Sequence, residues 1–270
     1  PLIKKVVGDL FGRKVHDDLN PDEVVALGAA IQADILAGNN QEVLLLDITP
    51  LSLGIETMGG LMDVLIPRNS KVPARASRQY TTQKDGQTGI RISVYQGERD
   101  LVQDNRKLAL FDLKGIPAMP AGLPKVELTF MINADGILQV SAKELRSGVS
   151  QTIEVKPQYG LTDEEVEKML LDSLTHAEQD IAQRALVEAQ TEATQLIDTT
   201  LHFLQKHHAR LSAAEHSNTQ QAITVLQQTL EQNDKNKIQA QCEQLNEITR
   251  PYAERIMNEA IGMALKGKSI

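Results

Sequence analysis

Residues 126–142 read VELTFMINADGILQVSA. Apolar side chains occupy every second position from Val126 to Ile132 and again from Leu138 to Ala142, and Asp135-Gly136 separates the two runs. Alternation with a period of two is typical of a strand with one buried face, and Asp-Gly favours a tight turn. The stretch therefore predicts two antiparallel strands joined by a hairpin.

The same alternation recurs at residues 51–56, 90–95 and 149–155. Dipeptides that favour tight turns separate these runs: Gly59-Gly60, Asp85-Gly86 and Ser147-Gly148. No long helical pattern lies between Leu51 and Tyr159, which disfavours a parallel α/β sheet. About eight short strands with tight turns predict an antiparallel β-sandwich.

The composition changes at Gly160. Residues 1–160 contain 15 of the 17 glycines and 9 of the 10 prolines, so the rest of the chain is free to form long helices. Apolar residues there follow a helical period, first from Val166 to Ile181 and then from Leu186 to Leu211. Helix starts are expected at Thr162 with Glu165, Ser212 with Glu215, Asp234 and Pro251, the last opening the final helix. We predict an all-helical bundle after the sandwich.

Residues 1–38 fit neither part. Asn20-Pro21 followed by Glu23 is a helix-start pattern, and a rather apolar helix is expected from there to Gly38. Residues 43–47 read VLLLD and allow two interpretations, a first sandwich strand or an apolar linker that docks on a partner surface. Because Pro1 stands where a natural start would carry methionine, we expect an excised fragment.

Charge and cysteine content exclude several classes of function. The 270-residue chain has 36 acidic against 28 basic residues, a net charge of −8, which argues against a nucleic-acid partner. No apolar run is long enough for a membrane span. The single cysteine, Cys242, excludes an internal disulfide and fits a reducing compartment, so we expect a cytoplasmic protein.

Signatures of catalysis are missing. The sequence has no Gly-rich phosphate loop, no dinucleotide-binding glycine motif and no nucleophile elbow. The Asn133–Gly136 turn lacks the outer ligands of a calcium loop, and His202, His207 and His208 have no acid or cysteine at a ligand spacing. We therefore expect this chain not to be an enzyme, with no catalytic residue, no metal site and no cofactor of its own.

A family resemblance rests on several tracts: VLLLDITPLSLGIETMGG at 43–60, IPRNSKVPARASRQYTT at 66–82, YQGERDLVQDNRKL at 95–108, GIPAMPAGLPKVELTF at 115–130 and INADGILQVSAKE at 132–144. Together they resemble the heat shock protein 70 (DnaK/HscA) family of chaperones. The tracts at 100–109, 115–122, 156–165 and 264–270 look more HscA-like than DnaK-like. The likeness extends over essentially the whole chain, more loosely in the helices.

The resemblance implies four parts. Residues 1–38 would be a helical remnant of the family's actin-like ATPase domain, and 39–47 the interdomain linker, with Val43, Leu44, Leu45, Leu46 and Asp47 as its docking residues. Residues 48–160 would be a peptide-binding sandwich and 161–270 its helical lid.

Family cleft positions carry over onto Ile55, Met58, Tyr80, Gln83, Ile90, Ile92, Leu123 and Val126. By this resemblance Ile90 lines the central pocket, and Met58 and Gln83 form an arch over the peptide. Ala121 stands where DnaK-like chains carry an arginine that latches the lid. From their pattern alone, Ile55, Ile90 and Ile92 are equally typical of core residues.

The implied function is to grip extended peptide segments, in particular a Leu-Pro-Pro-Val-Lys segment of the iron–sulfur scaffold IscU, with the J-type co-chaperone HscB delivering it. ATP and magnesium would serve the full-length parent. The alternatives are a generalist DnaK-like folding chaperone and, from another class, a β-sandwich hydrolase or glycan-binding module. A glycan site usually presents stacking aromatics, and aromatic residues make up 3% of this chain.

Overall fold

The computed structural model describes residues 2–15, 19–20, 22–36, 48–157 and 160–266. The chain divides into two compact units, residues 1–47 and 48–270. Residues 43–47, for which the sequence allows a first sandwich strand or an interdomain linker, lie outside the described residues.

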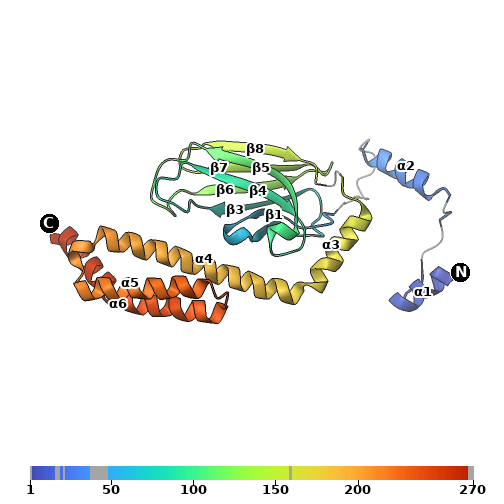
Figure 1. The fold of residues 1–270 in the computed structure, drawn as a ribbon. Helices are drawn as coiled ribbons and strands as arrows, with labels where there is room; N and C mark the ends of the chain where they lie inside the picture. The colour runs from blue at the N-terminus through green and yellow to red at the C-terminus, as the bar shows by residue number, and fades with distance from the viewer. Residues whose placement is uncertain (1, 16–18, 21, 37–47, 158–159, 267–270) are drawn as a thin grey trace. The chain divides into compact units, whose positions relative to one another are not determined.

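The first unit contains two helices, α1 (Leu2–Phe11) and α2 (Val24–Leu36) (Figure 1). The backbone N–H of Asp22 donates to Asn20 Oδ1 at 3.1 Å, which satisfies a free donor at the helix start. The predicted helix after Asn20 is therefore confirmed, whereas α1 was not anticipated. Both helices expose large apolar side chains, among them Phe11 and Val25.

The second unit opens with two four-stranded antiparallel sheets. The first has the strand order β2-β1-β4-β5 and comprises β1 (Leu53–Glu56), β2 (Met62–Ile66), β4 (Gly89–Gln96) and β5 (Arg106–Lys114). The second has the order β3-β6-β7-β8 and comprises β3 (Ala74–Tyr80), β6 (Val126–Ile132), β7 (Leu138–Glu144) and β8 (Ser150–Val155). Two short 3-10 turns, η1 (Met58–Gly60) and η2 (Val102–Asp104), lie in the connections.

One apolar core joins the two sheets. Leu53, Val94 and Leu113 from the first sheet are buried in the same cluster as Phe130 and Val140 from the second. In the β6–β7 hairpin, Ile132 pairs with Leu138, and Gly136 takes the positive φ of 72° that its turn needs. The alternating apolar residues of each sheet thus point into the space between the two sheets, as the period-two pattern requires.

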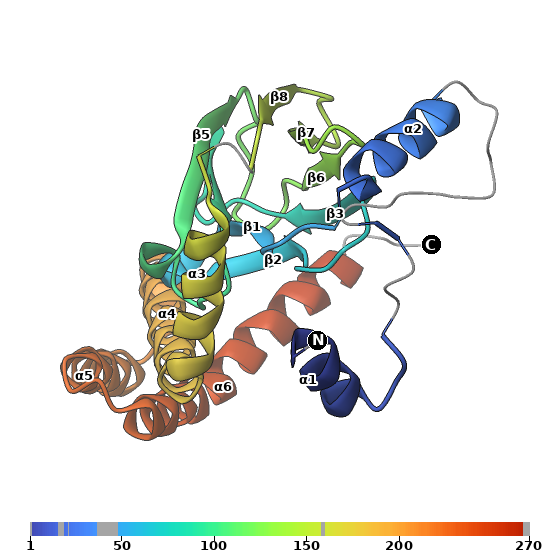
Figure 2. The same ribbon diagram turned by 90° about the vertical axis from the view of Figure 1, so that its right-hand side faces the viewer.

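Helices follow the strands: α3 (Asp163–Thr175), α4 (Ala177–Lys206), the 3-10 turn η3 (His208–Arg210), α5 (Ala213–Leu230) and α6 (Lys235–Lys266). Capping boxes are present at Thr162 with Glu165 and at Ser212 with Glu215, and Asp234 Oδ1 accepts the N–H groups of Asn236 and Lys237. Helices α4, α5 and α6 share a second core, which includes Ala193, Ile223, Leu226, Ile238 and Leu245. In Figures 1 and 2, α4 runs beside the first sheet. Helices α5 and α6 pack against α4. The chain therefore has a mixed fold of two antiparallel sheets and six helices among its described residues.

Two helical predictions are wrong. Pro251 lies inside α6 and opens no new helix. A proline inside a helix costs about 3 kcal/mol, but Leu245, Tyr252 and Ile256 around it are buried, and their packing holds the helix together across it. The apolar stripe expected from Val166 to Ile181 is also interrupted, because the helix ends and restarts at His176.

Candidate functional site

A groove of about 860 Å³ lies between the two sheets and α4. Its floor is apolar and comes from three strands: Ile55 on β1, Ile90 and Ile92 on β4, and Val126 and Leu128 on β6. Polar residues of α4 lie along one side, namely Gln195, Asp198 and Thr199. An apolar floor with polar groups at the rim is the usual composition of a ligand site.

The groove brings together seven of the eight residues expected at the cleft: Ile55, Met58, Tyr80, Gln83, Ile90, Ile92 and Val126. Ile55, Ile92 and Val126 also belong to the buried core, while Ile90 is half-buried and packs against that core. The same isoleucine and valine side chains therefore belong to the apolar core and form the floor of the groove.

Leu123 is the exception. Its side chain is 61% exposed, and it lines a separate shallow depression with Met119, Lys125 and Arg146. The reason is a turn in which the N–H of Leu123 donates to Pro120 O and the N–H of Gly122 donates to Thr82 O. This turn places Ala121 and Gly122, but not Leu123, among the residues that line the groove.

Asp63 of β2 binds two side chains of β3 beside the groove. The Tyr80 hydroxyl donates to Asp63 Oδ2 at 2.7 Å, and the Arg78 guanidinium is ion-paired with the same carboxylate. Burial, and then the hydrogen bond to Asp63, raise the pKa of Tyr80 well above its ordinary range, so its hydroxyl stays protonated as a donor. Since Tyr80 and Arg78 lie on β3, these bonds tie an edge strand of one sheet to an edge strand of the other.

The opposite rim consists of two loops held by short hydrogen bonds. The N–H of Ala121 donates to Asp85 Oδ1 at 2.7 Å, and the Thr81 hydroxyl donates to Pro124 O at 2.7 Å. Thr82, between them, is buried, and its Oγ1 has no hydrogen-bond partner among the described residues. This rim carries Gln83, whose side chain is exposed.

Helix α4 touches the groove rim through η1. Gln195 Nε2 donates to the Met58 sulfur at 2.9 Å. Gly59 takes a φ of 78°, and a Cβ there would lie 2.3 Å from Val187 Cγ1, so α4 passes close to this backbone because the residue is glycine.

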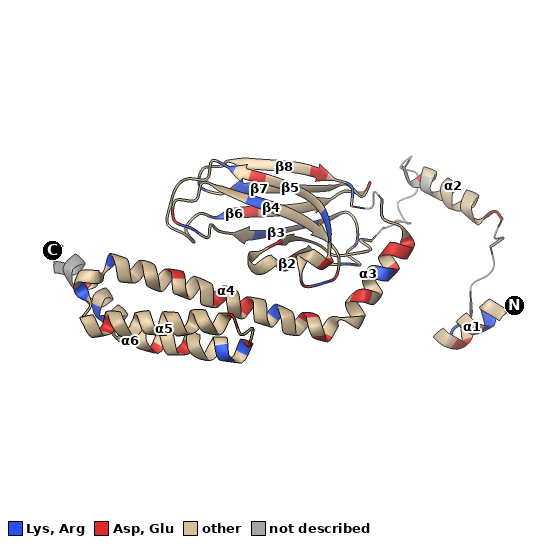
Figure 3. Ribbon diagram, viewed as in Figure 1, with Lys and Arg blue, Asp and Glu red and all other residues tan. Residues whose placement is uncertain are grey.

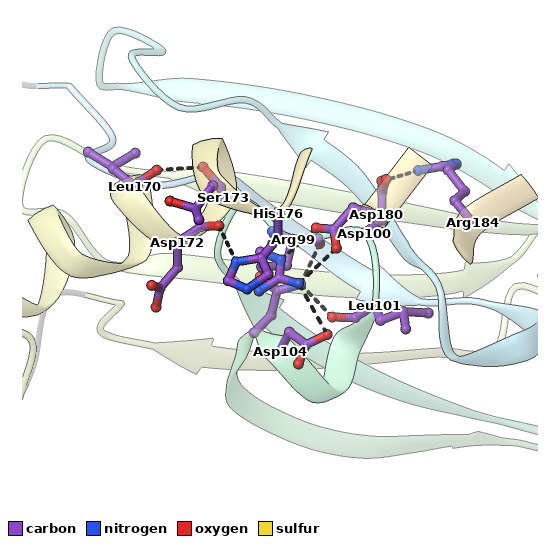
Figure 4. Close-up of polar contacts among 12 residues, drawn as sticks. Arg99, Asp100, Leu101, Asp104, Leu170, Asp172, Ser173, His176, Asp180 and Arg184 are labelled. Atoms are coloured by element: carbon purple, nitrogen blue, oxygen red, sulfur yellow. Dashed lines mark hydrogen bonds and ion pairs between the residues drawn. The ribbon is translucent and has the colours of Figure 1, made fainter. Parts of the chain in front are cut away.

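Ion pairs hold the start of α4 more firmly (Figure 4). Arg99 donates to both carboxylate oxygens of Asp180, at 2.5 and 2.7 Å, and Arg184 donates to Asp100 at 2.7 Å. The Arg99–Asp180 pair is mostly buried, and the Arg99 guanidinium lowers the pKa of Asp180. A bidentate arginine–carboxylate pair combines strength with a fixed orientation, so α4 is clamped at this end.

Sequence reasoning missed the α4 residues at the groove. Gln195, Asp198 and Thr199 have the spacing that places residues on one face of a helix, and this was the available signal. The polar character of that face gave no reason to assign it to a site.

Other features of the described residues do not compete with the groove. A depression of about 680 Å³ between His208 and His216 has only these two potential metal ligands, and no cluster of three or more such residues is found in the described part. Cys242 is buried, and burial raises the pKa of its thiol, which disfavours the reactive thiolate form. None of the described helices is both long and apolar enough to cross a bilayer.

Comparison with known proteins gives the family. The model of the family described as Hsp70 protein matches residues 1–258. The chain belongs to the Hsp70 family. It is 48% identical over its whole length to the chaperone protein HscA of Cronobacter sakazakii, 47% to that of an Enterobacter species and 46% to that of Escherichia coli. It spans 44% of the length of these relatives.

This membership corrects the expectation that the chain is not an enzyme. The match over residues 1–258 places it in a family of ATPase chaperones. The expectation rested on the missing phosphate loop, but a phosphate loop is only one way of holding a nucleotide, and its absence does not exclude an ATPase family.

Proposed function

We propose that residues 48–270 are the peptide-binding part of an HscA-like chaperone, in which the two sheets form a sandwich that holds an extended peptide and α3–α6 act as its lid. The observation that carries the proposal is the groove, which gathers seven of the eight expected residues beneath α4. In this proposal Ile90 receives an apolar side chain of the peptide, and Met58 and Gln83 pass over it as an arch.

The chemistry of the groove suits an extended segment. Such a peptide needs an apolar pocket for one or two side chains and partners for its backbone. The isoleucines of the floor supply the first requirement, and the loop backbone of residues 81–83 and 121–122 borders the same space. Burying one branched side chain contributes about 1.5–3 kcal/mol. We expect backbone hydrogen bonds and further contacts along the groove to add to this, so that affinity of about micromolar order remains after the ordering costs.

The relatives named HscA suggest the wider role. We propose that the client is an iron–sulfur scaffold of the IscU type, recognised through Leu-Pro-Pro-Val-Lys, that HscB presents it in the cytoplasm, and that ATP and Mg²⁺ are the cofactors of the whole protein. We assign these cofactors to no particular residues, because the described part holds no cluster of three or more metal-ligating side chains.

Fluorescence anisotropy with a labelled Leu-Pro-Pro-Val-Lys peptide tests the proposal. We expect micromolar binding, and we expect Ile90→Phe to weaken it at least tenfold by filling the pocket. Ile261→Phe on α6 is the matched control, since that isoleucine is exposed and distant in sequence from the groove residues. Equal affinity for wild type and Ile90→Phe, with unchanged unfolding midpoints, would place the peptide elsewhere.

A second candidate is a DnaK-like general chaperone, because the family model that matches residues 1–258 describes the Hsp70 family as a whole. The same assay separates the two, because a general chaperone would prefer leucine-rich peptides that lack proline.

A further inference from the structure

A second depression lies outside the groove, at the end of the sandwich where β6 and β8 begin. Its volume is about 360 Å³, and its lining comes from the β5–β6 connection and from the end of β7 with the turn after it: Met119, Leu123, Lys125, Glu144, Leu145 and Arg146. The N–H of Leu145 donates to Lys125 O at 2.9 Å, so the two segments are held together. We call this surface the basic depression.

The charges of the basic depression are unbalanced. Lys125 and Arg146 are exposed, and neither has an ion pair with a residue that the structure describes. Glu144 is the one acid in the lining, but its carboxylate is buried and already accepts hydrogen bonds from the turn that follows it. The surface therefore offers positive charge without a carboxylate to neutralise it.

The charge continues around this end of the sandwich. Lys114 ends β5, and a Cβ on the next residue, Gly115, would lie 3.7 Å from the Val149 side chain, so Lys114 lies near the β7–β8 turn. In Figure 3 blue segments are seen at the end of the sandwich where β8 begins, whereas α3 is mostly red, with acids in its first turn. Asp85, in the neighbouring loop, accepts the N–H of Ala121. A basic end is thus present on a chain whose net charge is −8.

Apolar surface accompanies this charge. Leu123 is 61% and Leu145 43% exposed, and both line the basic depression. Single exposed leucines are ordinary, but these two are gathered in one hollow beside two cations. A large apolar side chain placed there would leave water, while acids on either side of it would meet Lys125 and Arg146.

Arg146 has the geometry of an anchor for a carboxylate. One of its nitrogens, Nη1, donates to the Met119 sulfur at 3.1 Å, and sulfur is a weak acceptor. This contact leaves the other donors of the planar guanidinium for a ligand. A guanidinium can bind a carboxylate through two parallel hydrogen bonds, which a lysine ammonium cannot do.

We infer that the basic depression is a docking site for an acidic segment of a partner protein, in which a large apolar side chain lies between aspartates or glutamates. A nucleic acid is a poorer match, because the net charge of −8 repels a polyanion and because phosphates make no use of the two leucines. The basic depression and the groove share no lining residue, so this inference is independent of the proposed peptide-binding function.

Nuclear magnetic resonance of the 270-residue chain tests the inference, with the capped peptide Glu-Asp-Leu-Leu-Asp-Glu as the probe. We expect saturable shifts of the backbone amides of residues 119–125 and 144–148, and weaker binding as salt is added. The neutral peptide Gln-Asn-Leu-Leu-Asn-Gln should bind these amides about five times more weakly. The peptide Glu-Asp-Ser-Ser-Asp-Glu should also bind more weakly, because it has no apolar side chain.

Two variants and a control locate the charge. Arg146→Ala should weaken the acidic peptide about fivefold, and Arg146→Lys should weaken it less, because lysine keeps the charge but not the fork. Arg75→Ala is the matched control. Arg75 is exposed on β3 and pairs with Met131 at the far end of β6, so its variant should keep the wild-type affinity.

The peptide Leu-Pro-Pro-Val-Lys, added without a label, should not displace the acidic peptide, because the two sites are separate. Displacement, or shifts confined to the groove residues, would overturn the inference. So would the absence of any shift, equal affinity of wild type and Arg146→Ala, or tighter binding of a short single-stranded RNA to the same amides. None of these results would alter the test of the groove by Ile90→Phe.

Discussion

At the scale of single residues, Thr82 has an unusual position. It is 2% exposed, and its Oγ1 lacks a hydrogen-bond partner among the described residues, whereas the neighbouring Thr81 hydroxyl is bonded to Pro124 O. A buried hydroxyl without a partner costs roughly 1–3 kcal/mol. We expect Thr82→Val to raise the free energy of unfolding by about 1 kcal/mol, measured by urea denaturation.

Thr81→Val is the control for this prediction, because it removes a hydroxyl that is bonded. It should lower the free energy of unfolding by about 0.5–1.5 kcal/mol. Destabilisation by Thr82→Val would show that its hydroxyl has a partner after all.

The types of residues in the sequence predicted only some of the residues that line the groove. Apolar alternation places Ile55, Ile92 and Val126 in the interior but does not distinguish a core position from a groove floor, and the family resemblance supplied that distinction. Leu123 is as apolar as Ile90, yet one turn of backbone places it outside. Asp198 comes from a helix far along the chain, and its place at the groove depends on tertiary packing that no local pattern encodes.

At the scale of elements, the turn between β7 and β8 is built on a buried carboxylate. Glu144 is fully buried and accepts hydrogen bonds from the N–H groups of Arg146 and Ser147 and from the Ser147 hydroxyl. These bonds, the Ser147 hydroxyl first, lower the pKa of Glu144 despite its burial. The charged form is therefore the one that the fold stabilises.

The lowered pKa of Glu144 makes the stability of the protein depend on pH. The contribution of Glu144 is fully present above the ordinary pKa of a glutamate, and it is lost as pH falls through the lowered value of the folded state. We expect Glu144→Gln to lower the free energy of unfolding by about 1–3 kcal/mol near pH 7, because the amide satisfies fewer of these donors. We also expect the variant to lose less stability on acidification.

Urea midpoints from pH 7 to pH 3 measure both effects. Glu154→Gln on β8 is the control, since Glu154 is exposed and should leave the midpoints nearly unchanged. Parallel pH profiles for wild type and Glu144→Gln would contradict the assignment.

Strands with strong alternation were predictable, and others were not. The hairpin β6–β7 follows directly from its sequence, whereas β3 reads ARASRQY, and its apolar side chains on one face, Ala74, Ala76 and Tyr80, are only partly buried against the core. It is an edge strand, paired with β6 along its full length, so backbone hydrogen bonds define it more than its weak apolar face does. The Pro251 error has a different origin: the burial of neighbouring side chains keeps α6 continuous across a proline that by itself favours a helix start.

At the scale of the whole second unit, two separate cores are joined through the start of α4. The ion pairs of Arg99 with Asp180 and of Arg184 with Asp100 form this connection. Removing one partner of a mostly buried pair leaves a charge uncompensated and costs up to about 3 kcal/mol. We expect Asp180→Asn to loosen α4 from the sheets while both cores stay folded.

Hydrogen exchange tests this expectation. In Asp180→Asn, amides at the start of α4 and in η2 should exchange faster, and those of β6 and β7 should not change. Arg99→Lys should have an intermediate effect, since lysine keeps the charge but loses the bidentate geometry. Glu178→Gln, an exposed acid in the same helix turn, is the control, and an equal effect there would refute a specific role for Asp180.

The contact between Gln195 and Met58 has a kinetic consequence. It lies about 17 Å along α4 from the clamped Arg184, and it is a single hydrogen bond to sulfur, a weak acceptor. We therefore expect helix and rim to separate more readily here than at the Arg99–Asp180 ion pair. If a bound molecule enters and leaves past this contact, weakening the bond should speed arrival and departure together and shorten the residence time, while the equilibrium occupancy should change little.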